Sequence, residues 1–262
     1  MNRIGFSTRG LFWFKGRSDQ FLTKDTIRAL AEIKKSGYET AEVSCRSTQK
    51  YQMIQQVAKQ AKELGMEIYS IHFPKNTFED IDKHLFKCIE FARFLECSVA
   101  VIHPPKDIDR LHNMLILKRA VAKAEKYGVL LTLENMPWMN STHALHSLVE
   151  EYSMGVTLDF EFIYASGIPL NDFLQIFKKK IANCHVRDYD GNPYDSNHRR
   201  RYLLPGRGNI DFGRDFQILK NSGYRKPLMV ETAIHNPHEL LKVKEFLQGV
   251  FYDSSNPIQS GC

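Results

Sequence analysis

Short runs of apolar and β-branched residues alternate along the chain with longer segments in which apolar residues recur every three or four positions. The short runs are typical of buried strands, and the longer segments are typical of helices with one apolar face. Several helical segments end at a glycine suited to the left-handed conformation that closes a helix: Gly37, Gly65, Gly128 and Gly223. The eight candidate strands are RIGFST (3–8), TAEVSC (40–45), IYSIHF (68–73), VAVIHP (99–104), VLLTLEN (129–135), GVTLDF (155–160), NCHVRD (183–188) and LMVET (228–232).

A strand followed by a helix, repeated eight times, predicts an α/β fold built as a single (β/α)8 TIM barrel. An open doubly wound sheet is the alternative, but no G-x-G-x-x-G sequence follows the first run. No linker or change of composition separates two domains. We therefore expect the barrel to occupy residues 1–252 and the polar segment DSSNPIQSGC (253–262) to form a flexible tail.

Cysteine usage and the distribution of apolar residues indicate the cellular compartment in which the protein works. The five cysteines are odd in number and form no C-x-x-C pair, which argues against a disulfide framework and a thiolate zinc site. The first strand begins almost at once, without a charged and then apolar leader, and no apolar stretch reaches the roughly 18 residues that span a bilayer. We expect a cytoplasmic protein that does not enter membranes.

The formal net charge of +6 has two readings, a solvated lysine-rich surface or a surface that attracts polyanions. Lysines on the predicted helices, such as Lys59 and Lys62, favour the first reading. The one concentrated basic cluster is NHRRR (197–201), in a predicted loop.

Polar side chains close seven of the eight predicted strands: Glu42, His72, His103, Glu134, Asp159, His185 and Glu231. Strands of such a barrel place their active site at their C-terminal ends. Because side chains alternate along a strand, the apolar neighbours of His72 and Asp159 should face the helices while the polar set faces the barrel axis. Carboxylates that converge repel one another unless they are protonated or share a cation. The pattern therefore predicts a metal site, and it explains why the buried run LTLEN (131–135) ends on polar residues.

The ordered series SIHFP, VIHPP, TLEN, TLDF, CHVRD, PGRGNIDF and MVET covers nearly the whole chain. This series resembles the xylose isomerase-like TIM barrels, a group that includes sugar isomerases, sugar epimerases and apurinic endonucleases of the endonuclease IV type. In the ketose epimerase branch, the resemblance implies one divalent metal held by Glu134, Asp159, His185 and Glu231. Three carboxylates and one imidazole suit Mn²⁺ best, with Mg²⁺, Co²⁺ or Zn²⁺ as alternatives.

The resemblance implies a metal-dependent isomerase or epimerase of a sugar or sugar phosphate. The enzyme would remove a proton next to a carbonyl through a metal-bound enediolate, with Glu134 and Glu231 as the two catalytic bases. A proton returned to the same carbon gives epimerisation, and one returned to the neighbouring carbon gives isomerisation. The sequence leaves both outcomes open, and it also leaves open whether the protein forms a homo-oligomer.

The alternative is a metal-dependent apurinic endonuclease or phosphodiesterase. That branch needs more histidines than this chain offers, since Phe162 stands where one is expected and HRRRYL (198–203) contains no Asp-x-His. Nucleic acid is therefore the less favoured partner. His72 and His103 could hold a second metal together with Glu134, or they could bind substrate oxygens, and both readings stay open. A metal-binding protein without turnover is the third reading.

Three further residues are candidates for binding substrate. Arg187 lies two residues beyond His185 and would either hold a substrate oxygen or form a salt bridge with Glu161. Arg207, in the loop after the seventh strand, would suit a phosphorylated sugar together with the basic cluster 199–201. Trp138 would form part of an apolar wall over a sugar ring, with Trp13 and Phe14, or pack into the core.

Overall fold

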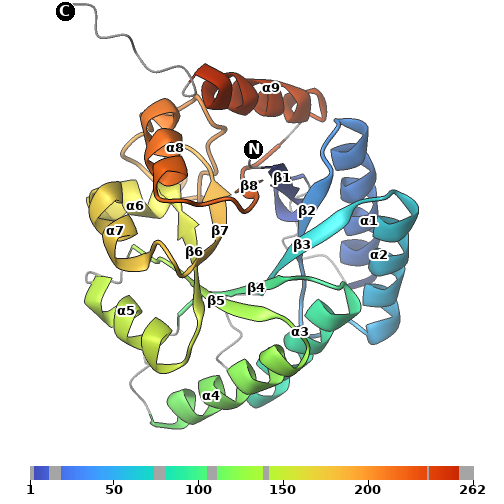
Figure 1. Cartoon of the computed structure of the whole chain (residues 1–262). Coiled ribbons are helices and arrows are strands. Elements are labelled where there is room, and N and C mark those ends of the chain that lie inside the picture. The colour runs from blue at the N-terminus through green and yellow to red at the C-terminus, as the bar shows by residue number, and fades with distance from the viewer. Residues whose placement is uncertain are drawn as a thin grey trace, which may run out of the picture.

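Eight parallel strands close into a barrel in the order in which they occur along the chain, which confirms the predicted (β/α)8 TIM barrel (Figure 1). The structure is a computed structural model that describes residues 3–11, 19–73, 81–104, 111–137, 142–234 and 236–253. The strands are β1 (Ile4–Ser7), β2 (Thr40–Ser44), β3 (Glu67–His72), β4 (Val99–Ile102), β5 (Leu130–Glu134), β6 (Gly155–Asp159), β7 (Ile181–Val186) and β8 (Leu228–Val230). Each lies within or overlaps one of the eight runs read from the sequence.

Helices surround the barrel (Figure 1). They are η1 (Thr8–Gly10, a 3-10 turn), α1 (Asp19–Lys35), α2 (Tyr51–Glu63), α3 (Ile81–Phe94), α4 (Leu111–Lys126), α5 (Thr142–Glu151), α6 (Phe160–Ser166), α7 (Leu170–Phe177), α8 (Phe212–Asn221) and α9 (His238–Asp253). All four glycines expected to close helices have φ between 58° and 90°, in the left-handed region that favours glycine. The loop after the seventh strand, in which Arg207 is expected, is the long segment between β7 and α8.

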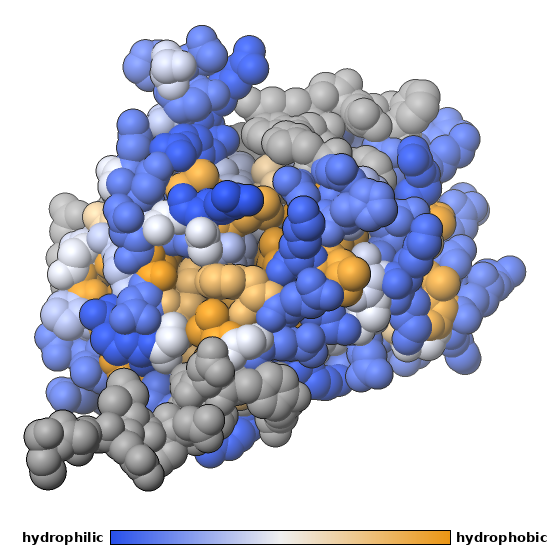
Figure 2. Space-filling model, turned by 90° about the horizontal axis from the view of Figure 1, so that it is seen from above, coloured by the Kyte–Doolittle hydropathy of each residue, from blue (hydrophilic) through white to orange (hydrophobic). Residues whose placement is uncertain are grey.

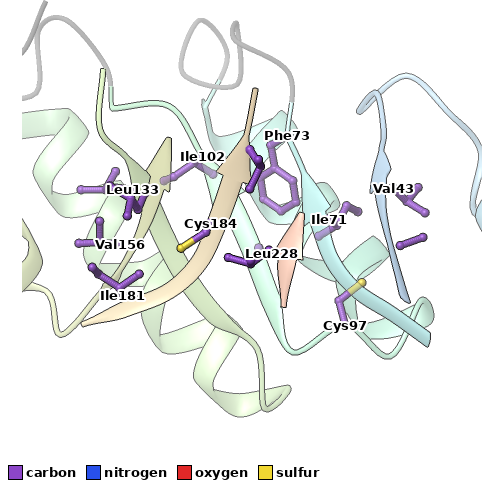
Figure 3. Packing of buried hydrophobic residues seen from close by; sticks show 14 of the residues in the cluster. Val43, Ile71, Phe73, Cys97, Ile102, Leu133, Val156, Ile181, Cys184 and Leu228 are labelled. Carbon is purple, nitrogen blue, oxygen red and sulfur yellow. The ribbon is translucent and has the colours of Figure 1, made fainter. Parts of the chain in front are cut away.

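The main core lies between the barrel and its helices, and it consists of the outward-facing strand residues and the inner faces of the helices. Ile71, Leu133 and Cys184, which each neighbour a polar strand-end residue, point into this layer (Figure 3). The alternation read from the sequence is therefore confirmed at these strands. Cys45, Cys88, Cys97 and Cys184 are buried free thiols, as expected, and Cys262 lies outside the described residues.

A second, smaller apolar cluster consists of Tyr69, Val99, Val101, Ala182 and Met229. The pairing register skips Tyr69 between the partners of Ala41 and Glu42, and it skips Ala182 between the partners of Val156 and Thr157. Tyr69 Oη donates a hydrogen bond to the Ala182 carbonyl at 2.5 Å, which joins β3 to β7 across the barrel. At these two irregularities the side chains of Tyr69 and Ala182 fill the barrel beneath the polar strand-end residues, and the polar residues that follow still face the axis.

One face of the molecule, viewed from above, carries mostly hydrophilic residues with smaller hydrophobic groups between them (Figure 2).

The basic cluster 197–201 is partly neutralised by ion pairs with acidic side chains. Arg200 pairs with Glu161 at 2.6 Å, and Arg201 pairs with Asp190 at 2.7 Å. Among the described residues, no helix has both the length and the apolar character needed to cross a membrane.

Two leucines of β5 test this description of the core. Leu133 is fully buried between barrel and helices, whereas Leu130 is 38% exposed at the start of the same strand. We expect Leu133→Ala to lower the free energy of unfolding by about 2–5 kcal/mol, through lost burial and the cavity left behind. Leu130→Ala should cost about 1 kcal/mol or less. Urea titration measures both values, and equal costs would contradict the assignment of Leu133 to the core.

Candidate active site

The barrel mouth brings together the four side chains expected to bind metal. One ligand atom from each of Glu134, Asp159, His185 and Glu231 lies within 4.8 Å of the others, and all four residues are buried. His185 Nδ1 is 2.7 Å from an oxygen of Glu134, 3.6 Å from one of Glu231 and 4.0 Å from one of Asp159. The four come from β5, β6, β7 and the end of β8, so the fold gathers them as the sequence analysis expects.

Asp159 and Asn135 fix the geometry where β5 and β6 end. Asp159 Oδ1 accepts a hydrogen bond from the Phe162 backbone and so caps α6, which leaves Oδ2 for the cluster. Asn135 binds the Asp159 backbone at both polar groups, accepting from its N–H at 2.6 Å and donating to its carbonyl at 3.2 Å. The amide that follows Glu134 is therefore a clamp that holds two neighbouring strand ends together.

Arg187 lies against three carboxylates. Its guanidinium is 2.5 Å from Asp159, 2.6 Å from Glu161 and 2.7 Å from Glu231. The salt bridge with Glu161, one of the two roles read from the sequence, is thus present. Phe162 and Tyr202 contact the guanidinium, with its carbon 4.6 Å and 5.3 Å from their ring centres. A side chain held by these groups is fixed in place, and its role toward substrate stays a prediction.

Arg9 is a site residue that the sequence analysis missed. It lies in η1, directly after β1, and its guanidinium is 3.6 Å from Glu231 and 3.4 Å from His72 Nδ1. Its side chain is 32% exposed, so it lies nearer to solvent than the four clustered residues. The rule that strand ends form the site applies to β1 as well, and it would have found Arg9, the residue directly after the run RIGFST.

His72 and His103 flank the cluster on the side of β3 and β4. His103 Nε2 is 2.9 Å from Glu134 Oε2, and the rings of His72 and His103 meet edge to face with centroids 4.9 Å apart. Burial lowers the pKa of His72 to about 4, so its imidazole is neutral near pH 7. His72, Glu134 and His185 form a second group that could hold an ion. The second metal expected at His72, His103 and Glu134 thus has His185 in place of His103 among the described residues, and substrate binding by His72 and His103 stays a prediction.

Burial and charge shift the clustered carboxyl groups in opposite directions. For Glu134, burial raises the pKa, but His103 and His185 outweigh it and hold the pKa well below its usual range. Burial also opposes the ionised form of Glu231, yet Arg187 and His185 lower its pKa to about 2. Burial raises the pKa of Asp159 well above its usual range, because Arg187 offsets only part of the effect. Asp159 is therefore the carboxylate with the most to gain from a nearby cation.

The residues present fit a divalent cation. Five carboxylates are linked here by ion pairs (Glu42, Glu134, Asp159, Glu161 and Glu231), and the described guanidinium groups that reach them belong to Arg9, Arg187 and Arg200. Among the described residues these carboxylates outnumber the guanidinium groups by two, and the excess of carboxylates around His185 raises the pKa of its imidazole well above its usual range despite burial. Glu231 Oε1 and His72 Nε2 are buried and make no hydrogen bond to the described residues. Oxygen donors with one imidazole are the ligands that Mn²⁺ and Mg²⁺ accept.

The remaining candidate residues either lie in another part of the structure than the cluster or fall outside the described residues. Arg207 is exposed in the segment between β7 and α8, and its backbone N–H bonds to the Leu204 carbonyl. Trp138, Trp13 and Phe14 lie outside the described residues. Asp188 organises the same segment, because its carboxylate accepts hydrogen bonds from the backbone of Gly206 and Ile210. The structure thus does not bring Arg207 to the cluster, and the prediction for Trp138 stays outside the described residues.

Comparison with known proteins agrees with this geometry. The model of the family described as xylose isomerase-like TIM barrel matches residues 30–249. A protein of Methanocaldococcus jannaschii, named as the uncharacterized protein MJ1311, is 26% identical, with 87% of this chain and 85% of that protein covered. A D-tagatose 3-epimerase-like protein has a TM-score of 0.73 at 23% identity, with 97% and 98% covered. The D-allulose 3-epimerase of Methylomonas sp. has a TM-score of 0.75 at 16% identity, with 95% and 98% covered. At such identities, the likeness to solved structures shows a shared fold.

Alanine substitutions separate the two possible ion sites. Asp159→Ala should abolish stable Mn²⁺ binding, with affinity falling more than about 100-fold, because it removes a ligand rather than an outer contact. His72→Ala should keep the ion at its original stoichiometry if one metal is bound. Metal content after equilibrium dialysis measures both variants. Equal loss of Mn²⁺ in both would contradict a single site and indicate two ions coupled through Glu134.

Proposed function

We propose that the chain, which belongs to the xylose isomerase-like TIM barrel family, is a divalent-metal-dependent isomerase or epimerase of a sugar or sugar phosphate. The observation that carries the proposal is the pair Glu134 and Glu231, two buried carboxylates from β5 and the end of β8 that both face His185 Nδ1. Solved structures with this fold include a D-tagatose 3-epimerase-like protein and an L-ribulose 3-epimerase, which supports the choice of a carbohydrate substrate.

In this proposal Glu134, Asp159, His185 and Glu231 hold the ion, with Mn²⁺ as the preferred metal. The ion would supply positive charge that acidifies the C–H bond next to a substrate carbonyl and offsets the negative charge that develops there. A bound cation would offset the excess negative charge of the carboxylates in the cluster, and this is the structural reason to expect an ion there.

The cytoplasm is the proposed location of the protein.

Glu134 and Glu231 are the proposed bases. A base must be ionised before it can accept a proton, and the lowered pKa of each carboxyl group meets that condition at neutral pH. His103 contacts Glu134 at 2.9 Å, and Arg9 lies 3.6 Å from Glu231, so each carboxylate has its own stabilising neighbour. One glutamate removes the proton, and the other returns a proton to the carbon.

The residues that border the cluster are proposed to have different roles in binding the substrate. His72, His103 and Arg9 are proposed to orient the hydroxyl and carbonyl oxygens of the substrate, because they border the cluster from β3, β4 and η1. Arg187 is proposed to hold Asp159 and Glu231 in place and to contact a substrate oxygen. Trp138 and Arg207 are proposed to contact the ring and a phosphate group of the substrate. Return of the proton from the opposite face gives epimerisation.

Glutamine substitutions test the two bases without removing a metal ligand. Glu134→Gln and Glu231→Gln each keep an oxygen for the ion but lose the base, and each should lower kcat about 10²–10⁴-fold. With a ketose substrate in D₂O, the wild type should incorporate deuterium at the carbon next to the carbonyl. Turnover is measured with metal-loaded protein, and metal content is measured on the same samples.

Glu125→Gln on the exposed surface of α4 is the matched control and should leave kcat unchanged. A Glu134→Gln or Glu231→Gln variant that holds metal at the wild-type stoichiometry and turns over at the wild-type rate would disprove the role of that glutamate as a base.

A further inference from the structure

Glu42 lies on β2 inside the barrel, and its carboxylate contacts the histidine of the four-residue cluster. The side chain is fully buried, and Oε2 is 3.0 Å from His185 Nε2. The same oxygen accepts hydrogen bonds from Ser70 Oγ at 2.8 Å and from Asn183 Nδ2 at 3.3 Å. These donors come from β3 and β7, so two other strands hold the Glu42 carboxylate in one position.

His185 therefore has different surroundings at its two ring nitrogens. Nδ1 faces the carboxylates of Glu134 and Glu231, at 2.7 Å and 3.6 Å. Nε2 faces the Glu42 carboxylate, which can only accept a hydrogen bond. A ring nitrogen and a carboxylate oxygen cannot meet at 3.0 Å or 2.7 Å with lone pair against lone pair, so both Nε2 and Nδ1 carry a hydrogen in this structure. A cation held by Glu134, Asp159 and Glu231 would take the place of the hydrogen on Nδ1, whereas the hydrogen on Nε2 would stay bonded to Glu42.

We propose that Glu42 is a positioning residue that holds His185 in the Nε2–H tautomer and so directs the Nδ1 lone pair toward Glu134, Asp159 and Glu231. The proposal rests on the metal site of the proposed function. A histidine that binds a metal usually donates its other N–H to a carboxylate, carbonyl or water, and this contact fixes both the tautomer and the orientation of the ring. The negative charge behind the ring also raises the basicity of the ligand nitrogen.

The position of Glu42 distinguishes this role from that of a fifth ligand. The Glu42 oxygen lies beside Nε2, whereas the three carboxylates of the cluster lie beside Nδ1. Glu42 is also absent from both groups of described residues whose ligand atoms lie close enough to share an ion. Its effect on an ion must therefore pass through the ring of His185.

Glu42→Gln tests the proposal in the full-length protein. The amide keeps the shape of the side chain but can turn its nitrogen toward Nε2, which stabilises the opposite tautomer. Mn²⁺ affinity of the metal-stripped protein is measured by calorimetry, and thermal unfolding of the metal-free protein is measured in parallel. We expect Mn²⁺ binding to weaken about 10–100-fold, the range observed when an outer partner of a metal ligand is lost.

Asp215→Asn is the matched control, since it converts another fully buried carboxylate to an amide outside the site. Asp215 lies on α8 and accepts a hydrogen bond from Tyr164 Oη at 2.7 Å. This variant should bind Mn²⁺ as the wild type does. An equal loss of affinity in Asp215→Asn would assign the effect to general destabilisation and overturn the role of Glu42.

A second measurement needs no variant. Nitrogen-15 NMR of the wild-type protein loaded with Zn²⁺, which is diamagnetic, should report a hydrogen on His185 Nε2 and none on Nδ1. A hydrogen on Nδ1, or equal Mn²⁺ affinity in the wild type and Glu42→Gln, would overturn the role of Glu42 and leave the proposed function standing. A wild-type protein that binds neither Mn²⁺ nor Zn²⁺ would overturn both.

Discussion

Five carboxylates are buried at one end of a single barrel, and their mutual repulsion is the constraint on which the site depends. A charge taken out of water must be paired, or it shifts its pKa and becomes neutral. The protein uses both solutions. Arg187 pairs with three of the carboxylates, while Asp159 has a pKa raised well above its usual range. A divalent cation would remove the remaining imbalance without any change in the fold.

His185 connects the two halves of this network. One ring nitrogen faces Glu42 from β2, and the other faces carboxylates from β5, β6 and β8. Because the contacts cross the barrel, they exist only when all the strands are closed in register. The smaller apolar cluster beneath, joined by the Tyr69 hydrogen bond to Ala182, supports the strands that carry these groups. Barrel closure, packing and the chemistry of the site are therefore linked through the same few strands.

The amino-acid pattern predicts the barrel and its polar strand ends because both follow from local periodicity. Asp159 and His185 each sit between apolar neighbours, Glu134 follows the apolar Leu133, and parallel strands of a barrel must bring their ends together. The contact between Glu42 and His185 cannot be predicted from such a pattern. Its contact with His185 depends on two skipped positions in the register, at Tyr69 and Ala182, which no periodicity in the sequence marks. Arg200 turns inward from a long loop for a similar reason, since its partner Glu161 is set by tertiary packing.

Anomalous diffraction from crystals grown with Mn²⁺ would test most directly whether these side chains share an ion. The account predicts one strong peak per chain, within bonding distance of Glu134, Asp159, Glu231 and His185 Nδ1, with Glu42 still at His185 Nε2. A peak held only by His72 and His103, or no peak in crystals saturated with Mn²⁺, would contradict the assignment of the four ligands and the mechanism that depends on it.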